Sequence, residues 1–172
     1  MSESTSQEVW ILPYDPAWPQ LQVAEMKRIK QALGPCDIEP IGSAAIAGIS
    51  GKPIIDLLIG TFSPSKEAFF EDLKKLGYKQ GQAQSKEYGV SFLELVREED
   101  KPAVHLHVAP INGPYWQAMI TFRDALRSDS SLARRYEILK RNLADLHPTD
   151  LDAYAAGKSE FVRSVLGGAN VR

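Results

Sequence analysis

The sequence predicts an α+β fold in which a small mixed sheet with helices is followed by a C-terminal segment of three helices. Two observations carry this prediction. Short apolar runs bounded by Gly, Pro or polar turn residues are typical of strands up to residue 113, whereas the apolar spacing from Pro114 onward is wholly helical. Strands and helices do not alternate regularly, which disfavours a doubly wound sheet. The 172 residues fit one domain overall.

Prolines, glycines and apolar runs define the first elements. Residues 1–8 are polar, and we expect them to be disordered. The prolines of the segment YDPAWP start a helix at Pro16 or Pro19, and Gly34-Pro35 ends it. A second helix is predicted from about Ser65 to Leu76. Strands are predicted at 38–41, 54–59, 90–96 and 104–108.

Three helices are predicted after Pro114, with breaks at 128–131 and at His147-Pro148. The third begins at a capping-box pattern, Thr149 to Asp152, and runs to about Leu166. We therefore assign 9–113 to an α/β core and 114–166 to a helical segment packed on that core.

Composition excludes several classes of protein. Twenty Lys and Arg face 22 Asp and Glu, so no overall charge attracts nucleic acid or an anionic membrane. A single cysteine, Cys36, excludes an intramolecular disulfide and fits a reducing compartment. No apolar run approaches the ~20 residues that span a membrane, and the first residues do not resemble a signal peptide. We expect a cytoplasmic protein with no membrane partner, and the oligomeric state stays open.

The segment IGSAAIAGISGKPIIDLLIG, residues 41–60, contains two candidate site features. Gly42-Ser43 ends an apolar strand, and if the next residues form a helical turn, Ser43 caps it and the free amides make an anion site. A capped turn without a ligand is the alternative. Asp56 lies within the next apolar strand, where an unpaired carboxylate costs several kcal/mol, so it either belongs to a site or has a structural partner.

Twelve residues separate Ser43 from Asp56, and this arrangement resembles the signature of the nucleotidyltransferase superfamily. The longer pattern resembles the GrpB family within it. The matching motifs occur in order along nearly the whole chain: YDPAWP, IGSAAIAGISGKPIID, HLHV, FRDALR, YEILKRNLA and YAAGKSEFV.

The resemblance implies a chemistry. The terminal phosphates of a nucleoside triphosphate, expected to be ATP, would lie on the Gly-Ser turn, and carboxylates would hold two Mg²⁺ ions. A group of an unidentified small-molecule or protein acceptor would attack the α-phosphorus as pyrophosphate leaves. Asp56 matches the first metal-binding carboxylate, but Leu58 stands where the second is expected. Pro40 and Ala44 also depart from the family pattern, which has His and Thr there.

Other residues could complete the site. Glu94 lies on an apolar strand face, and either faces the metal or pairs with Arg97 or Lys101. His105 and His107 project from one face of the HLHV strand, and could ligate a metal, contact phosphate or form a hydrogen-bonded pair. The resemblance assigns a family residue to His107, so we place Asp56, Glu94 and His107 in the catalytic set.

Basic residues of the rear half are candidates for phosphate binding. Lys158 interrupts the apolar stripe of the last predicted helix, so it either reaches the rim or meets a buried anion. The full predicted set is Gly42, Ser43, Lys52, Arg123, Arg127, Lys140 and Lys158. A solvated face is the expectation for Arg134, Arg135 and Arg141.

Two functions compete on this sequence. One is a Mg²⁺-dependent enzyme that transfers a nucleotidyl group or forms an adenylate. The other is a nucleotide- or metabolite-binding module that keeps the phosphate cradle without two-metal chemistry. Leu58 favours the binding module, whereas Asp56 and the rear cations favour the enzyme.

Overall fold

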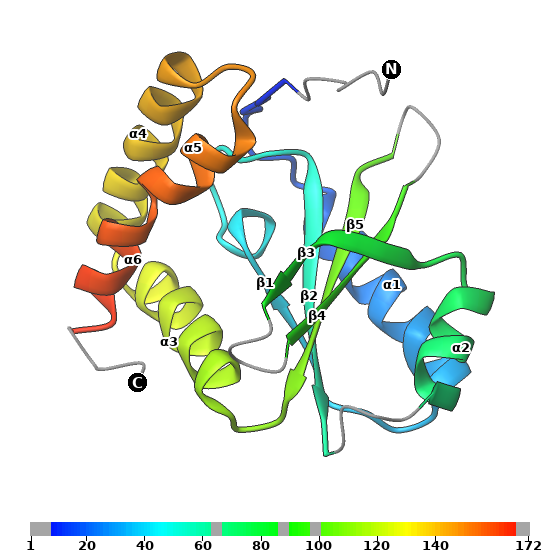
Figure 1. Cartoon of the computed structure of the whole chain (residues 1–172). Helices are drawn as coiled ribbons and strands as arrows, with labels where there is room; N and C mark the ends of the chain where they lie inside the picture. The colour runs from blue at the N-terminus through cyan, green and yellow to red at the C-terminus, as the bar shows by residue number, and fades with distance from the viewer. Residues whose placement is uncertain (1–7, 63–66, 86–89, 97–100, 168–172) are drawn as a thin grey trace.

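The computed structural model describes residues 8–62, 67–85, 90–96 and 101–167, and its centre is a five-stranded mixed sheet (Figure 1). The strand order is β1-β2-β5-β4-β3; β2 and β5 are parallel, and every other neighbouring pair is antiparallel. The strands are β1 (Ile38–Ile41), β2 (Ile54–Thr61), β3 (Lys79–Ser85), β4 (Val90–Leu95) and β5 (Ala103–Pro110).

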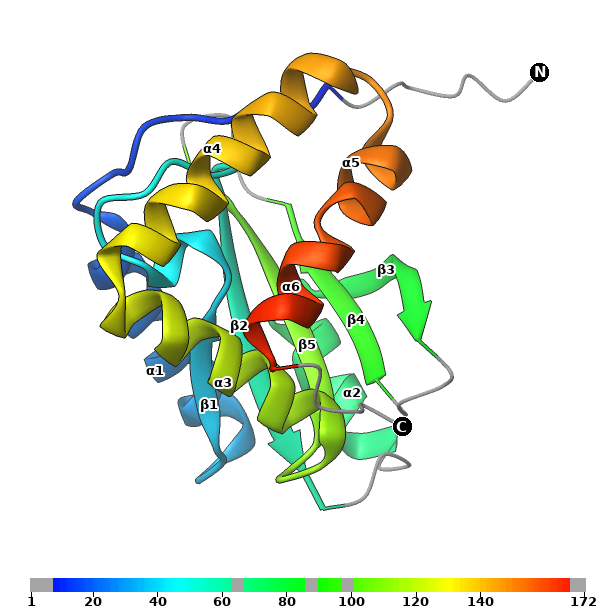
Figure 2. The ribbon, with the colours of Figure 1, turned by 90° about the vertical axis from the view of Figure 1, so that its left-hand side faces the viewer.

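Helices cover both faces of this sheet (Figure 2). α1 (Trp18–Leu33) and α2 (Glu67–Lys75) lie on one face. The opposite face carries the C-terminal helices, which are α3 (Pro114–Ser128), α4 (Ser130–Leu146), α5 (Leu151–Gly157) and α6 (Ser159–Val165). The one-turn 3-10 helix η1 (Ser43–Ala45) follows β1 and contacts β1, β2 and α1. Within the described residues, no helix is long and apolar enough to cross a membrane.

The alternation of side chains along β2 and β5 divides the protein into a core face and a site face. Ile55, Leu57 and Leu106 are fully buried and pack with α1 and α2 side chains in the main hydrophobic core. Because successive strand residues point to opposite faces, Asp56 and the two histidines of β5 face the C-terminal helices. The predicted division of the HLHV strand is confirmed.

The sheet register brings distant parts of the sequence into one row. Asp56 pairs with His105, which pairs in turn with Glu94 on β4. The next row along the strands places Leu58 beside His107. Paired residues lie about 5 Å apart, so parts of the chain nearly 50 residues apart in sequence meet on the site face.

The α+β class, the mixed sheet and the C-terminal helices are confirmed. β3 was not predicted, because its sequence KQGQAQS is polar and lacks alternating apolar residues. It lies at an edge of the sheet, where a strand needs little apolar material. The expectations for residues 1–7, for a helix start near Ser65 and for Arg97 lie outside the described residues.

The third predicted C-terminal helix is wrong in two details. It is divided into α5 and α6 at Lys158, and Asp150 rather than Thr149 caps its start by accepting from the Ala153 N–H. Gly157 lets α5 approach α4, because a Cβ there would lie 2.4 Å from Leu143 Cδ2. This close approach places Lys158 over the site face.

Candidate functional site

A sharp turn after β1 forms one wall of the site. Gly42 has φ of 71°, a conformation that favours glycine, and it occupies the N-cap position of η1 without a side-chain cap. The prediction that Ser43 caps this turn is therefore wrong. Ser43 is instead the first residue of η1, and its Oγ accepts a hydrogen bond from Lys140 Nζ at 2.6 Å.

Gly42 also explains how the turn approaches Asp56. A Cβ at position 42 would lie 2.3 Å from Asp56 Oδ2, so no other residue fits without displacing the carboxylate. Position 42 therefore requires glycine for two reasons: its positive φ angle and its close contact with Asp56 of β2. This contact holds the Gly-Ser turn and the carboxylate against each other.

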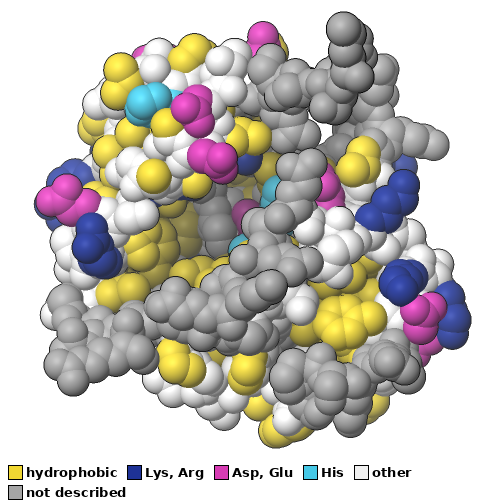
Figure 3. All heavy atoms as spheres, viewed as in Figure 1, with side chains coloured by type: hydrophobic (Ala, Val, Ile, Leu, Met, Phe, Trp, Pro, Cys, Tyr) yellow, Lys and Arg dark blue, Asp and Glu magenta, His cyan; other side chains and the backbone are white. Residues whose placement is uncertain are grey.

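Ser43 and Asp56 open into a common cavity of about 280 Å³, which we call the cationic cavity. It lies between the sheet and the C-terminal helices, where the surface is hollowed and histidine and acidic side chains are visible (Figure 3). The described residues that line it are Gly42, Ser43, Lys52, Ile54, Asp56, Phe92, His105, His107, Tyr136, Lys140, Tyr154 and Lys158. Three lysines thus face one aspartate.

His107 connects Asp56 to α3. Its Nε2 lies 3.4 Å from Asp56 Oδ1, and its Nδ1 lies 2.7 Å from the Tyr115 hydroxyl. A neutral ring must carry its proton on Nε2 to donate to the carboxylate, and Nδ1 then accepts from Tyr115. Burial and the charge of Asp56 raise the pKa of Tyr115, so the phenol keeps the proton that it donates.

The carboxyl of Asp56 stays ionised in this setting. Burial raises its pKa, but the hydrogen bond from His107 and the nearby positive charges outweigh burial, so the pKa lies below its ordinary value. Lys52 contributes to the same lowering. An ionised carboxylate held by a fixed imidazole is a suitable metal ligand, because such ligands are usually oriented by hydrogen bonds of this kind.

Glu94, which we predicted as a metal ligand together with Asp56, is separated from Asp56 by one strand. His105 lies between them, with Nδ1 3.8 Å from Asp56 Oδ1 and Nε2 3.6 Å from Glu94 Oε1. The cause is the register, since β5 separates the strands that carry the two acids. In the described part of the chain, no group of three or more His, Cys, Asp or Glu side chains could hold a metal ion.

The position of the expected second carboxylate is sealed. Leu58 is fully buried in a cluster with Ile41, Val90 and Ala109. Side chains of α3, among them Trp116, pack against that cluster. Hydrocarbon therefore fills the space in which a second metal-binding side chain of β2 would lie.

Two lysines converge on the cationic cavity, of which Lys140 is fully buried and Lys158 is half-buried. Burial and the neighbouring Lys158 lower the pKa of Lys140 to about 7. Burial and the neighbouring Lys52 lower the pKa of Lys158 to about 8. Each ammonium also lies over an aromatic ring, Lys140 over Tyr136 at 5.0 Å and Lys158 over Tyr154 at 4.5 Å. The charge of Asp56 offsets part of this repulsion, since it raises the pKa of both lysines.

Arg123 and Arg127 of α3, which we predicted to bind phosphate, lie outside the cationic cavity. Their hydrogen-bond partners belong to β1 and to the turn that follows it. Arg123 donates to Glu39 Oε2 at 2.6 Å and to the Pro40 carbonyl. Arg127 donates to the Ala45 carbonyl at 2.8 Å. Neither lines the cationic cavity, so both fix the backbone on either side of Gly42-Ser43 rather than contacting a ligand there.

A buried carboxylate that the sequence analysis did not single out supports the opposite wall. Glu137 on α4 accepts the Ser50 N–H at 3.0 Å and also pairs with Arg134 and Arg141. Burial raises the pKa of Glu137, but these donors dominate and hold it at about 2. Arg134 and Arg141 are exposed as expected, and they serve this ion pair as well.

Tyr115 is the site residue that sequence reasoning missed. We interpreted it as one of the apolar residues that α3 buries. It follows the HLHV strand by only a few residues, which places it near His107. Such short connections keep consecutive elements in contact, and this was the available signal.

Comparison with known proteins identifies the family of this chain. Residues 8–167 match the model of the family described as GrpB protein. The chain belongs to the GrpB family. Its relatives include the glutamate-rich protein GrpB of Alkalihalophilus pseudofirmus, which is 35% identical over 92% of this chain and 94% of the relative. A UPF0157 protein of Pseudomonas aeruginosa is 34% identical over 98% of this chain and 70% of its own.

A solved member of the GrpB family has the same fold. The crystal structure of the conserved protein GrpB from Enterococcus faecalis superimposes with a TM-score of 0.79 at 26% sequence identity. The match covers 92% of this chain and 96% of the Enterococcus chain. The sheet and the C-terminal helices of this chain therefore have counterparts in that relative.

Proposed function

We propose that this GrpB protein is a nucleotidyltransferase-like enzyme that acts on or through a nucleoside triphosphate with Mg²⁺. It would transfer the nucleotidyl group to a small molecule or a protein, or activate either as an adenylate. The observation that carries the proposal is the cationic cavity, in which the buried Lys140 and the half-buried Lys158 face Asp56 beside the Gly42-Ser43 turn.

The charge of the cavity supports an anionic ligand. Desolvated ammonium groups lower each other's pKa, and a phosphate between them would relieve both the repulsion and the lost hydration. At about 280 Å³ the cavity is small for a complete ligand and suits the phosphate groups of a nucleotide. Ser43 and Lys52 add polar contacts at its rim.

The residues also fit one Mg²⁺ ion. Mg²⁺ is commonly bound by one or two carboxylates together with substrate phosphates and water, and Asp56 supplies one such carboxylate. Bound there, the ion would offset the charge of the phosphates. His107, fixed by Tyr115, would orient the carboxylate, while the lysines hold the phosphates for attack on the α-phosphorus and departure of pyrophosphate.

The experiment is a paired screen with ATP, CTP, GTP and UTP, each with and without Mg²⁺ or Mn²⁺. Thermal unfolding reports binding, and pyrophosphate release reports turnover. We expect metal-dependent stabilisation by one nucleotide and release of pyrophosphate when an acceptor is present. Lys158→Met should weaken nucleotide affinity about tenfold or more, and the exposed Lys74→Met on α2 is the matched control. Equal affinities in the two variants would reject the proposal.

One observation favours a second function. Leu58 and the packing of α3 fill the place of a second metal-binding carboxylate. A nucleotide- or metabolite-binding module of the same fold would need only the cationic cavity. Stabilisation by nucleotide without pyrophosphate release, across a panel of acceptors, would select this function over the enzyme.

A further inference from the structure

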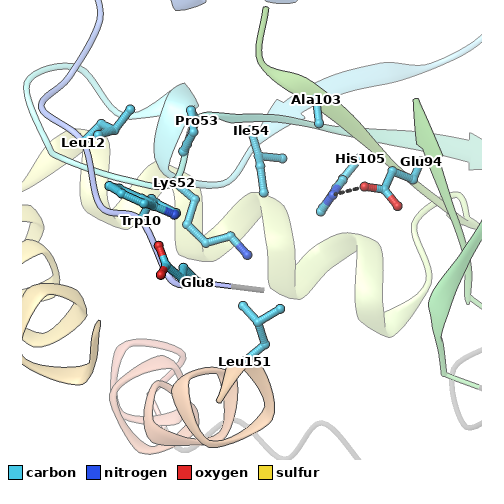
Figure 4. A pocket seen from close by; sticks show the side chains of 10 residues that line it. All are labelled: Glu8, Trp10, Leu12, Lys52, Pro53, Ile54, Glu94, Ala103, His105 and Leu151. Carbon is cyan, nitrogen blue, oxygen red and sulfur yellow. Dashed lines mark ion pairs between the residues drawn. The ribbon is translucent and has the colours of Figure 1, made fainter. Parts of the chain in front are cut away.

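A second and larger cavity adjoins the cationic cavity. Its volume is about 570 Å³, and the two cavities share Lys52, Ile54 and His105 (Figure 4). We call it the apolar cavity, and its remaining lining residues are Glu8, Trp10, Leu12, Pro53, Glu94, Ala103 and Leu151. A molecule bound there would lie next to whatever occupies the cationic cavity.

One wall of the apolar cavity is the segment before α1. Val9 N–H donates to the Pro148 carbonyl at 2.8 Å, and the backbone of Leu12 forms two hydrogen bonds with Gly51, at 2.9 and 3.0 Å. These bonds fix the segment at both ends. Trp10 between them is 61% exposed, and Leu12 is 40% exposed. Such exposed, rigidly held apolar faces are typical of ligand sites.

The balance of charged groups is acidic in this cavity and basic in its neighbour. Glu8 and Glu94 are its acids, and Lys52, on the boundary, is its lysine (Figure 4). Carboxylates beside an apolar wall disfavour phosphate and favour an ammonium group, and an indole face also attracts cations. The shared wall therefore separates a cavity suited to phosphate from a cavity suited to an amine.

We propose that the apolar cavity binds the second substrate, an aromatic molecule that carries an amine. This inference rests on the proposed function. The ring of this molecule packs on Trp10, Leu12 and Leu151, and its amine points toward the carboxylate of Glu94, which lies beside His105 at the other end of the cavity from Glu8 (Figure 4). In this arrangement the acceptor lies beside the nucleotide phosphates, with His105 on the wall between them.

Lys52 links the two cavities energetically. Its ammonium group repels an amine in the apolar cavity, and an anion in the cationic cavity offsets that charge. Occupation of one cavity should therefore strengthen binding in the other. This coupling distinguishes neighbouring substrate sites from two independent pockets.

The probe is phenethylamine, compared with 3-phenylpropionate, which carries a carboxylate on a similar framework. Saturation-transfer NMR with the full chain measures both without nucleotide. We expect phenethylamine to bind more tightly than 3-phenylpropionate. Its affinity should fall about tenfold in Trp10→Ala and in the cavity-filling Ala103→Trp. It should fall about fivefold in Glu94→Gln, with the exposed Glu71→Gln on α2 as the matched control.

Inorganic pyrophosphate tests the coupling. Saturating pyrophosphate should raise the affinity for phenethylamine about fivefold, and Lys52→Met should raise it without pyrophosphate and abolish the coupling. Equal binding of both probes, no effect of the Trp10 and Ala103 substitutions, or displacement of phenethylamine by adenosine would overturn the amine assignment. Amine binding in a protein that binds neither pyrophosphate nor nucleotide would overturn the proposed function and the acceptor role together. Pyrophosphate binding without amine binding would overturn this inference alone.

Discussion

At the scale of single residues, Asp56 and the lysines around it have opposing effects on an anion. The carboxylate repels phosphate when no metal is present. When it binds Mg²⁺, the ion attracts phosphate, so the carboxylate then strengthens phosphate binding. The same side chain should therefore weaken or strengthen binding according to the metal in solution. This reversal separates a metal ligand from a merely structural acid.

Asp56→Asn should show the reversal. Without metal, the variant should bind pyrophosphate about fivefold more tightly than the native protein, a change of about 1 kcal/mol, because one negative charge is lost. With Mg²⁺ it should bind more weakly than the native protein. Isothermal titration calorimetry checks both values. If the ratio of variant to native pyrophosphate affinity is the same with and without Mg²⁺, Asp56 is not a metal ligand.

Leu58 is the second residue with a specific expectation. Leu58→Asp places an unpaired carboxylate in a fully buried apolar cluster under α3, so we expect the free energy of unfolding to fall by about 3 kcal/mol or more. Leu58→Met conserves volume and should cost less than about 1.5 kcal/mol. Urea unfolding measures both. Native stability of Leu58→Asp, with faster pyrophosphate release, would mean that the position is open to metal after all.

At the scale of elements, the contact between α4 and α5 determines where Lys158 lies. A Cβ at position 157 would overlap the Leu143 side chain, so either that side chain or α5 must shift. If α5 shifts, Lys158 moves away from the cationic cavity. Packing between two helices therefore controls the position of a cationic group.

Gly157→Ala should weaken pyrophosphate binding about tenfold, because the new Cβ displaces α5 and Lys158 with it. Its effect on stability should be small, since the better helix propensity of Ala offsets part of the overlap. The exposed Ala156→Gly is the control: it should lose about 1 kcal/mol of stability with unchanged anion affinity. Native affinity in Gly157→Ala would show that Leu143 yields without moving the helix.

Prediction from sequence succeeded where a local pattern determines the geometry. The alternation along HLHV and the Gly-Ser turn before Asp56 correctly predicted that these segments face one cavity, because strand periodicity and sheet register leave little freedom. It failed where the partner is distant. Arg123 was predicted to bind phosphate because it is one of the basic residues of the rear half. In the structure it forms ion pairs with Glu39 on β1 and with its neighbour Asp124. Nothing in the spacing of α3 reveals that pairing.

At the scale of the whole molecule, the lowered pKa values of Lys140 and Lys158 link stability to pH. In the unfolded chain both lysines bind protons up to about pH 10.4, whereas in the folded protein they lose them near pH 7 and pH 8. The unfolded state therefore binds more protons above pH 7, and the free energy of unfolding must rise with pH. Below pH 7 the full cost of two buried charges remains.

Between pH 7 and 8.5, the unliganded protein should gain stability on the order of 1 kcal/mol. This window lies below the range in which Cys36 and the buried tyrosines, whose pKa values are raised, reverse the trend. Thermal unfolding across the window measures the gain. Lys140→Met should reduce the slope, and saturating pyrophosphate should flatten it by restoring both protons. If neither Lys140→Met nor pyrophosphate changes the pH dependence of stability, groups other than these lysines cause it.

The pinned segment from Val9 to Leu12 has a practical consequence for anyone who handles this protein. Because Glu8 and Trp10 line the apolar cavity, a purification tag or fusion joined directly to Glu8 would begin beside that cavity and compete with small molecules for it. A tag at the carboxyl end, beyond α6, avoids those two lining residues. Ligand screens should therefore be run on chains whose amino end carries no added sequence.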